Sequence, residues 1–219
     1  VDDNLKVLAI KTISNYKDTN CLSSLMFCLN DKSSSTKVRL ASAEALGTIG
    51  DRNAFDSLTN IVVDDSEKST YVKESAVVAL GMLGDNRALD VFDSILNTKQ
   101  MFLDKFSYLK ERIIEALPKF DISKDKKALK ILKNSLLDHS EHLRIVAIET
   151  VMNSDFDCAY DLIYDRLLYD DSLEVRKNAL VALYNISDRK ILDNVALGDY
   201  PPELKQYALE LLEEYENEC

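Results

Sequence analysis

Residues 38–62 read VRLASAEALGTIGDRNAFDSLTNIV, and residues 72–96 read VKESAVVALGMLGDNRALDVFDSIL. The two segments align without a gap, so that Val38 corresponds to Val72 and Val62 to Leu96. Similarity at such a fixed spacing is typical of proteins that stack one supersecondary unit on the next. Related segments begin at five further places, namely Leu5, Leu109, Leu143, Val175 and, as a final half-unit, Leu204.

The first half of each repeat has the pattern of an amphipathic helix, which we name helix A. Small or aliphatic residues recur at positions 0, 4, 7 and 8, as in Val38, Ser42, Ala45 and Leu46, and this spacing places them on one stripe. A break follows, often with glycine, and then an aspartate in five of the six repeats: Asp18, Asp51, Asp85, Asp125 and Asp188. An aspartate there is expected to accept hydrogen bonds from the free amides of the next helix, helix B.

Helix B carries an apolar stripe of its own, as in Ala54, Leu58, Ile61 and Val62. One hairpin cannot bury both stripes, whereas stacked hairpins can. The sequence therefore predicts an all-α fold, a right-handed α-α superhelix of the armadillo type. We expect six helical hairpins, starting near residues 5, 38, 72, 109, 143 and 175, and a capping helix over 204–216, all in a single domain of residues 1–219. The first residue is Val1 rather than Met, which leaves open that the chain is a fragment of a longer protein.

The pattern VRxxAxxALGxIGDxxAxxxL closely resembles the HEAT-like repeat first described in phycobilisome lyases. The resemblance covers nearly the whole chain. It implies an α-solenoid of HEAT-like repeats. For function it implies less, because the same repeat serves scaffolds, regulators and a few enzymes.

Composition limits the partners of this protein. The formal net charge is −11 and the pI about 4.7, and nucleic-acid binding draws on Lys and Arg that neutralise phosphates, so we expect no nucleic-acid partner. No apolar run approaches the roughly 18 to 20 residues of a membrane span, and no signal-peptide pattern opens the chain. The four cysteines have no disulfide or zinc spacing, which favours a reducing compartment. We expect a cytoplasmic protein; the alternative is an extracytoplasmic one whose leader was removed.

The second position of helix A is always basic: Lys6, Arg39, Lys73, Lys110, Arg144, Arg176 and Lys205. One interpretation is a basic stripe for nucleic acid. The favoured interpretation is a ladder of ion pairs with acidic residues that end the preceding helix B, as the resemblance implies. Suitable acids are Asp31, Asp64, Asp65, Asp138, Asp170 and Asp171.

The B helices are expected to line the concave face, where solenoids usually bind a partner. Two columns of helix B would then form a mostly acidic groove with a lysine pair near its middle. Its candidate partner-binding residues are Asp56, Asp90, Asp93, Lys130, Lys133, Asp161, Tyr164 and Asp193. The hypothesis is a groove for a basic or mixed-charge segment of another protein; the alternative is a solvated helix face in an acidic protein.

The third junction between repeats is longer and more apolar than its neighbours. Met101, Phe102 and Phe106 lie close together there and are candidates for an apolar contact with a partner. The alternative is that they extend a helix and cover a repeat junction. Pro118 stands where neighbouring repeats have glycine, and it predicts a bend or an early helix stop.

Neither catalytic residues, nor a metal site, nor a cofactor are predicted. His139 and His142 are the only histidines, and two ligands without Cys or further His fall short of a zinc site. Some hydroxylases built from HEAT repeats hold iron with His-Glu dipeptides, and no such dipeptide occurs here. We therefore expect a non-enzymatic scaffold or adaptor. The alternative, supported by the resemblance alone, is a lyase-type enzyme, lyase subunit or chaperone that handles a bilin-like chromophore.

Overall fold

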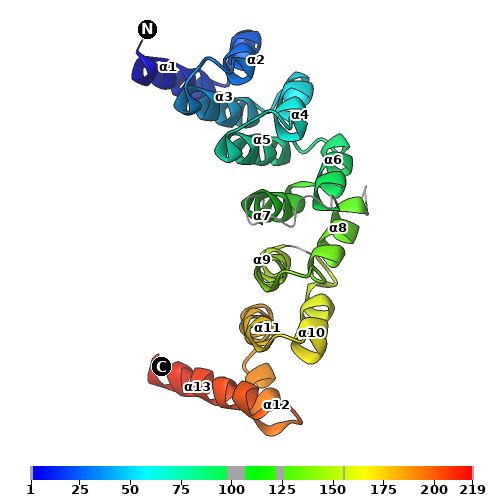
Figure 1. Ribbon diagram of the computed structural model, residues 1–219. Coiled ribbons are helices and arrows are strands. Elements are labelled where there is room, and N and C mark those ends of the chain that lie inside the picture. The colour runs from blue at the N-terminus through cyan, green and yellow to red at the C-terminus, as the bar shows by residue number, and fades with distance from the viewer. Residues whose placement is uncertain (1, 98–106, 122–125, 155, 219) are drawn as a thin grey trace. The chain divides into compact units, whose positions relative to one another are not determined.

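The structure is a computed structural model that describes residues 2–97, 107–121, 126–154 and 156–218. Within these ranges the chain has 13 α-helices and no strand (Figure 1). The odd-numbered helices are the A helices and the even-numbered ones the B helices of the repeats. Their bounds are α1 Asp3–Tyr16, α2 Leu22–Asn30, α3 Thr36–Ile49, α4 Phe55–Val63, α5 Thr70–Leu83, α6 Arg87–Leu96, α7 Ser107–Ala116, α8 Lys127–Ser135, α9 Glu141–Met152, α10 Ala159–Tyr169, α11 Leu173–Ile186, α12 Lys190–Leu197 and α13 Pro202–Glu218.

The chain divides into two compact units, residues 1–129 (unit 1) and 130–219 (unit 2). In unit 1, α3 packs against α1 and α5, and α5 packs against α7. Helix α2 packs on α3, and helix α4 packs on α5. In unit 2, α11 packs against α9, α10 lies on both of them, and α12 packs on α13 (Figure 1). The predicted all-α fold is confirmed. The number of hairpins and the single domain stay predictions.

The breaks between helices A and B follow the chemistry of their residues. Gly50 and Gly84 end α3 and α5 with a positive φ, a left-handed conformation that favours glycine. Each described aspartate of the break accepts a hydrogen bond from the backbone N–H two residues on: Asn20 at 3.0 Å from Asp18, Asn53 at 2.9 Å from Asp51, Arg87 at 3.1 Å from Asp85 and Lys190 at 2.8 Å from Asp188. The capping predicted for this column is confirmed at these four positions, and Asp125 lies outside the described residues.

Pro118 ends helix α7 early, as predicted. Helix α7 stops at Ala116, and a single 3₁₀ turn, Leu117–Lys119, follows. A proline has no backbone N–H for the next helical bond. The chain then turns inward, so that Phe120 is buried.

The C-terminal helix is longer than predicted. Helix α13 starts two residues before the expected 204 and ends two residues after the expected 216.

Small residues bring the A helices of unit 1 into close contact. A Cβ built on Gly47 of α3 would lie 2.8 Å from the Cα of Ala79 in α5. A Cβ on Gly81 of α5 would lie 2.9 Å from the Cβ of Ala116 in α7. These glycines are therefore required for the packing of one A helix on the next.

The two contacts predict different responses to alanine. Gly81→Ala is expected to lower the free energy of unfolding by about 1–3 kcal/mol through overpacking. Adding Ala116→Gly removes the side chain in conflict and should restore the free energy of unfolding lost to overpacking. The new glycine in α7 itself costs about 1 kcal/mol, so the recovery stays incomplete by that amount. In Gly47→Ala the conflict is with backbone, so Ala79→Gly should not restore stability. Urea unfolding of the four variants, followed by circular dichroism, tests this; equal rescue at both contacts would contradict it.

Candidate functional site

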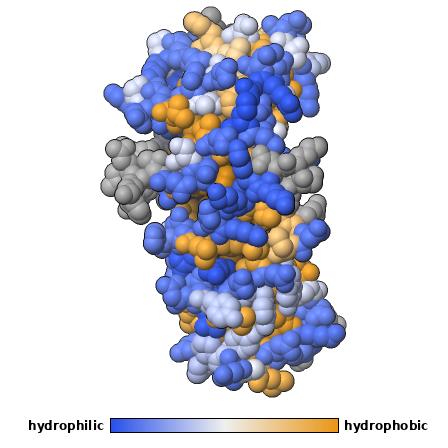
Figure 2. All heavy atoms as spheres, turned by 90° about the vertical axis from the view of Figure 1, so that its right-hand side faces the viewer, coloured by the Kyte–Doolittle hydropathy of each residue, from blue (hydrophilic) through white to orange (hydrophobic). Residues whose placement is uncertain are grey.

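The side chains predicted to bind a partner lie on the B helices of both units. We name these eight residues the B-helix surface: Asp56, Asp90, Asp93, Lys130, Lys133, Asp161, Tyr164 and Asp193. Five of them are exposed, three are partly exposed and none is buried. The face drawn in Figure 2 shows mostly hydrophilic side chains, with apolar patches between them. Each member is therefore within reach of a partner, and their arrangement as a concave groove stays a prediction.

Two aspartates of the B-helix surface in unit 1 have polar partners. The Nζ of Lys127 lies 2.9 Å from Asp90, and the amide of Asn97 donates to Asp93 at 2.8 Å. Because both side chains of the Lys127–Asp90 pair are exposed, their attraction contributes little to stability. A cationic side chain of a partner can therefore compete for Asp90 at low cost.

One aromatic ring beside this surface in unit 1 is covered by a cation. The guanidinium carbon of Arg87 lies 4.0 Å from the centre of the Phe55 ring. Asp85 holds Arg87 with two bonds, Nε to Oδ1 at 3.1 Å and one terminal nitrogen to Oδ2 at 2.8 Å. This bidentate pair holds the pKa of the Asp85 carboxyl below its usual range. Ring, guanidinium and carboxylate thus form one ordered group.

Unit 2 has a tyrosine cluster in the corresponding place. Tyr160 and Tyr164 stack in α10, with ring centres 5.7 Å apart and planes at 16°. The hydroxyl oxygens of Tyr164 and Tyr200 are 3.5 Å apart, which links α10 to the segment before α13. Burial, followed by the contact with Tyr164, raises the pKa of Tyr200 to about 12. We name Tyr160, Tyr164 and Tyr200 the tyrosine cluster; Tyr164 was predicted from the sequence and the other two were not.

Two arginines of the basic column, Arg39 and Arg144, are buried and the third, Arg176, is partly exposed; all three donate hydrogen bonds to other parts of the helix stack. Arg39 in α3 forms an ion pair with Glu67, and both side chains are almost fully buried. Its Nε donates to the carbonyl of Leu29 in α2 at 2.8 Å. Arg176 in α11 donates in the same way to the carbonyl of Leu167 in α10, at 2.7 Å.

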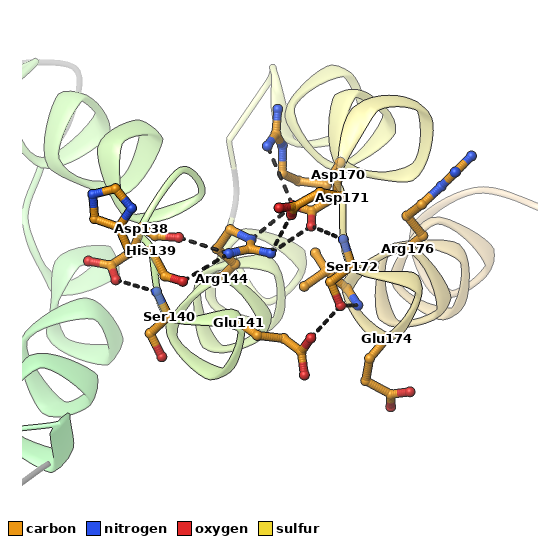
Figure 3. A network of polar contacts seen from close by, with 12 residues as sticks. Asp138, His139, Ser140, Glu141, Arg144, Asp170, Asp171, Ser172, Glu174 and Arg176 are labelled. Carbon is orange, nitrogen blue, oxygen red and sulfur yellow. Dashed lines mark hydrogen bonds and ion pairs between the residues drawn. The ribbon is translucent and has the colours of Figure 1, made fainter.

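Arg144 in unit 2 has the most extensive network of this kind (Figure 3). Its Nε and one terminal nitrogen donate to the two oxygens of Asp170 at 2.9 and 2.8 Å, and the same nitrogen reaches Asp171 at 3.0 Å. Its other terminal nitrogen donates to the carbonyl of Asp138 at 2.9 Å. Burial opposes ionisation of Asp170, yet the bonds from Arg144 together with the N–H of Ser172 outweigh it and hold the pKa of this carboxyl below its usual range.

The predicted ladder is present at Arg39 and Arg144, but the prediction was wrong about where the acids of these two pairs come from. The acid that pairs with each buried arginine follows helix B of the same repeat: Glu67 follows α4 and pairs with Arg39, and Asp170 follows α10 and pairs with Arg144. The preceding helix B supplies backbone carbonyls instead. The reason is that the last carbonyls of an α-helix have no partner within it and are the nearest acceptors to the start of the next helix.

A surface recess of about 250 Å³ lies beside this network. Its lining is Leu137, Asp138, His139, Arg144, Arg166, Tyr169, Asp170 and Asp171. The Arg166 guanidinium also approaches Asp170, at 3.5 Å. Because the cations that line the recess already face carboxylates, it is the open side of an ion-pair network and offers no unpaired charge to a ligand.

The motif Asp-x-Ser after the B helices was missed by the sequence reasoning. Each such aspartate accepts a hydrogen bond from the serine N–H two residues on: Ser33 at 2.9 Å from Asp31, Ser66 at 2.8 Å from Asp64, Ser140 at 2.8 Å from Asp138 and Ser172 at 3.0 Å from Asp170. Ser140 and Ser172 also cap the next helix, α9 or α11, through their side chains. The four occurrences, each after a B helix, were the available signal. They show that these aspartates, which were predicted to pair with the basic column, stabilise the turn after helix B.

Other predicted features have simpler outcomes. Met101, Phe102 and Phe106 lie outside the described residues. In the part of the chain that is described, no three His, Cys, Asp or Glu side chains are grouped to hold a metal ion. None of the described helices is long and apolar enough to cross a membrane.

The negative charge of the protein is concentrated in unit 2. Residues 1–129 contain 18 Lys and Arg against 19 Asp and Glu, a net charge of −1. Residues 130–219 contain 9 against 19, a net charge of −10. Unit 2 taken as a whole therefore attracts cations.

The comparisons with known proteins agree with this architecture. The family model described as HEAT repeats matches residues 1–70 and 32–103. A chain of the complex of CpcE and CpcF of phycocyanin lyase from Nostoc sp. PCC7120 is 21% identical, with 97% of this chain and 82% of that chain covered and a TM-score of 0.54. No curated protein matches the sequence.

Two further solved structures are similar at lower TM-scores. Human deoxyhypusine hydroxylase in complex with glycerol is 19% identical, covers 99% of this chain and 81% of its own, and has a TM-score of 0.42. The archaeal HEAT-like repeats protein from Thermococcus onnurineus NA1 is 15% identical, covers 96% and 95%, and has a TM-score of 0.46. At such identities the likenesses concern the fold alone. The protein is a helical protein of HEAT-like repeats.

Proposed function

We propose that this protein is a non-enzymatic scaffold whose B-helix surface holds a basic or mixed-charge segment of another protein. The observation that carries the proposal is the net charge of −10 in unit 2, whose B-helix surface presents Asp161 and Asp193 beside the exposed Lys130 and Lys133. Charge of one sign on a surface speeds the encounter with an oppositely charged partner and selects against acidic ones.

The buried arginines support the same proposal. Arg39 and Arg144 have their guanidinium groups in ion pairs inside the helix stack. They are therefore unavailable to phosphates or to acidic partners. The charge that the B helices present is the one on their exposed side chains: on α10 it is negative, from Asp161 and Asp165, whereas on α12 the exposed Lys190 offsets Asp193.

Handling of a bilin chromophore is the alternative that an experiment has to separate. Its support is the likeness to a chain of a phycocyanin lyase complex, which at 21% identity concerns the fold. A scaffold requires no catalytic residue and no cofactor, so it asks for nothing beyond the exposed surface.

A crosslinking experiment with charge reversal tests the scaffold. A photoreactive phenylalanine analogue is placed at Asp161 or Asp193 on B helices, or at the exposed Glu149 or Glu210 on A helices, in the full chain, which is then irradiated in lysate of the source cell. We expect one partner to be crosslinked from the B-helix positions and not from the A-helix positions. Its affinity should fall at least about tenfold in Asp161→Lys/Asp193→Lys at low salt, and less at high salt.

The matched control is Glu149→Lys/Glu210→Lys, which changes the net charge equally on the A helices and should leave affinity within about twofold. Equal losses in the two double variants would contradict a specific B-helix surface. Crosslinking from the A-helix positions alone would also contradict it. A visible absorbance band acquired on mixing with a bilin, with no protein crosslinked, would favour the alternative.

A further inference from the structure

We infer that Tyr160, Tyr164 and Asp188 in unit 2 form a docking site for an arginine side chain of a partner protein. The inference rests on the proposed function, and it narrows a charged surface to one site and one side chain.

Unit 1 contains an occupied example of such a site. The Arg87 guanidinium lies over the Phe55 ring at 4.0 Å from its centre, and Asp85 binds the same guanidinium through two nitrogens. An arginine combines both contacts because its planar group stacks on a ring while its edge donates to a carboxylate. The Phe55 ring is buried beneath it.

The repeat places equivalent residues in unit 2. Tyr160 occupies the Phe55 column, four residues after the position of the capping aspartate in its repeat. Asp188 occupies the Asp85 column of the next repeat. The Arg87 column holds Lys190, whose Nζ lies 3.6 Å from Asp188 and whose side chain is 84% exposed.

The ring that Arg87 would cover is therefore open in unit 2. Tyr160 is 40% exposed, and Lys190, a compact ammonium on a flexible stem, does not reproduce the flat contact of a guanidinium. The carboxylates of Asp188 and Asp161 act electrostatically on Tyr160. The aromatic face and the acid are both in place, and the missing member of the group is the arginine.

The tyrosine cluster orders this face in advance. Tyr160 stacks on Tyr164, which in turn approaches the hydroxyl of Tyr200. Burial raises the pKa of Tyr160 and of Tyr200, so both remain neutral at physiological pH. An ordered ring loses little conformational freedom when a partner side chain settles on it. The charge of unit 2 favours a cation at the same place.

A peptide titration of the full chain tests the site. The chain is labelled with ¹³C in its tyrosine rings and titrated with acetyl-Gly-Arg-Gly-amide, with Tyr160→Phe and Tyr164→Phe used to assign the signals. We expect saturable shifts of the Tyr160 and Tyr164 signals at millimolar peptide. The lysine peptide should bind at least about fivefold more weakly, and the uncharged citrulline peptide should cause no shift. Asp188→Asn should weaken the arginine peptide by about fivefold or more.

The variant Lys190→Arg supplies the missing side chain from the protein itself. It is expected to move the Tyr160 signal towards its peptide-bound position and to block the arginine peptide. Lys133→Arg, a change at another exposed lysine, on α8, should leave both unchanged. A Lys190→Arg chain that still bound the peptide with wild-type affinity would overturn the inference, as would equal shifts from the citrulline peptide.

The outcomes separate this site from the proposed function. If the arginine peptide causes no shift while Asp161→Lys/Asp193→Lys still loses the crosslinked partner, the arginine site is wrong and the scaffold stands. If the peptide binds at Tyr160 but no protein is crosslinked from the B helices, the site stands and the scaffold is wrong.

Discussion

Arg144→Met is expected to lower the free energy of unfolding of unit 2 by about 3–5 kcal/mol. The Asp170 side chain is only 1% exposed, and Arg144 donates to both of its oxygens. Methionine fills much of the same volume but leaves a buried carboxylate without its main partner, and the carbonyl of Asp138 loses its donor as well. Chemical denaturation followed by circular dichroism measures the loss. Hydrogen exchange of α9 and α11 assigns it to unit 2.

The double variant Arg144→Met/Asp170→Leu separates the cost of a broken pair from the value of an intact one. Replacing both charges by apolar side chains of similar volume is often neutral, so we expect it to recover most of the stability lost by the single variant. Arg166→Met, which removes a longer contact to the same aspartate, should cost less than Arg144→Met. A free energy of unfolding of Arg144→Met within about 1 kcal/mol of wild type would show that the Arg144–Asp170 pair does not stabilise unit 2 as its geometry indicates.

The contribution of the Arg144–Asp170 pair to the free energy of unfolding is expected to decrease as the pH is lowered. The pKa of Asp170 is lowered in the folded chain, because the bonds from Arg144 and from the N–H of Ser172 together outweigh its burial. A lowered pKa contributes stability that is fully present above the unfolded pKa of about 4 and is lost as the pH falls through the folded pKa. The double variant lacks this carboxyl, so its stability should fall less steeply than that of the wild type below about pH 4.

The local parts of this structure are predictable from sequence because their causes are local. The Asp51 column could be assigned to helix capping since the N–H that it binds is two residues away. Pro118 could be assigned to an early helix stop since it removes a hydrogen bond within its own turn. The partners of Arg39 and Arg144 are different in kind. Their acids lie beyond a whole further helix, α4 or α10, and the choice between the preceding and the following segment depends on how helices stack.

In the candidate site, too, the features that depend on one repeat were predictable, and those that depend on contacts between repeats were not. Exposure of Asp161, and in part of Asp193, follows from the amphipathic pattern of the B helices. Tyr160 was not singled out, because in its own column it looks like one more apolar residue, next to Leu22 and Phe55 in other repeats. Its role depends on the neighbouring repeat, where Lys190 stands in place of an arginine. The exposed ring can be recognised only when the columns of Phe55, Asp85 and Arg87 are compared together.

Phe92→Ala is expected to lower the free energy of unfolding of unit 1 by about 3–5 kcal/mol. Phe92 of α6 is fully buried, and its ring meets the edge of Phe120 with centres 5.9 Å apart and planes at 87°. Leucine stands at the same column in α2 and α4, as Leu25 and Leu58. The larger ring in α6 fits because α7 stops early at Pro118 and the chain then places Phe120 against it. Alanine would leave a cavity at this junction that neither neighbour can fill.

A double-mutant cycle tests whether the two rings depend on each other. Phe92→Leu restores the residue of the other repeats and should cost less than Phe92→Ala, yet it still loses the edge contact with Phe120. With Phe120→Leu the cycle should give a coupling energy of about 0.5–1.5 kcal/mol, measured by urea unfolding. Phe27→Ala is the matched control; its ring is 71% exposed on α2, and the change should stay within about 0.5 kcal/mol. Additive single effects would mean that Phe120 fills space at this junction independently of Phe92, and that the early stop of α7 is not what selects phenylalanine in α6.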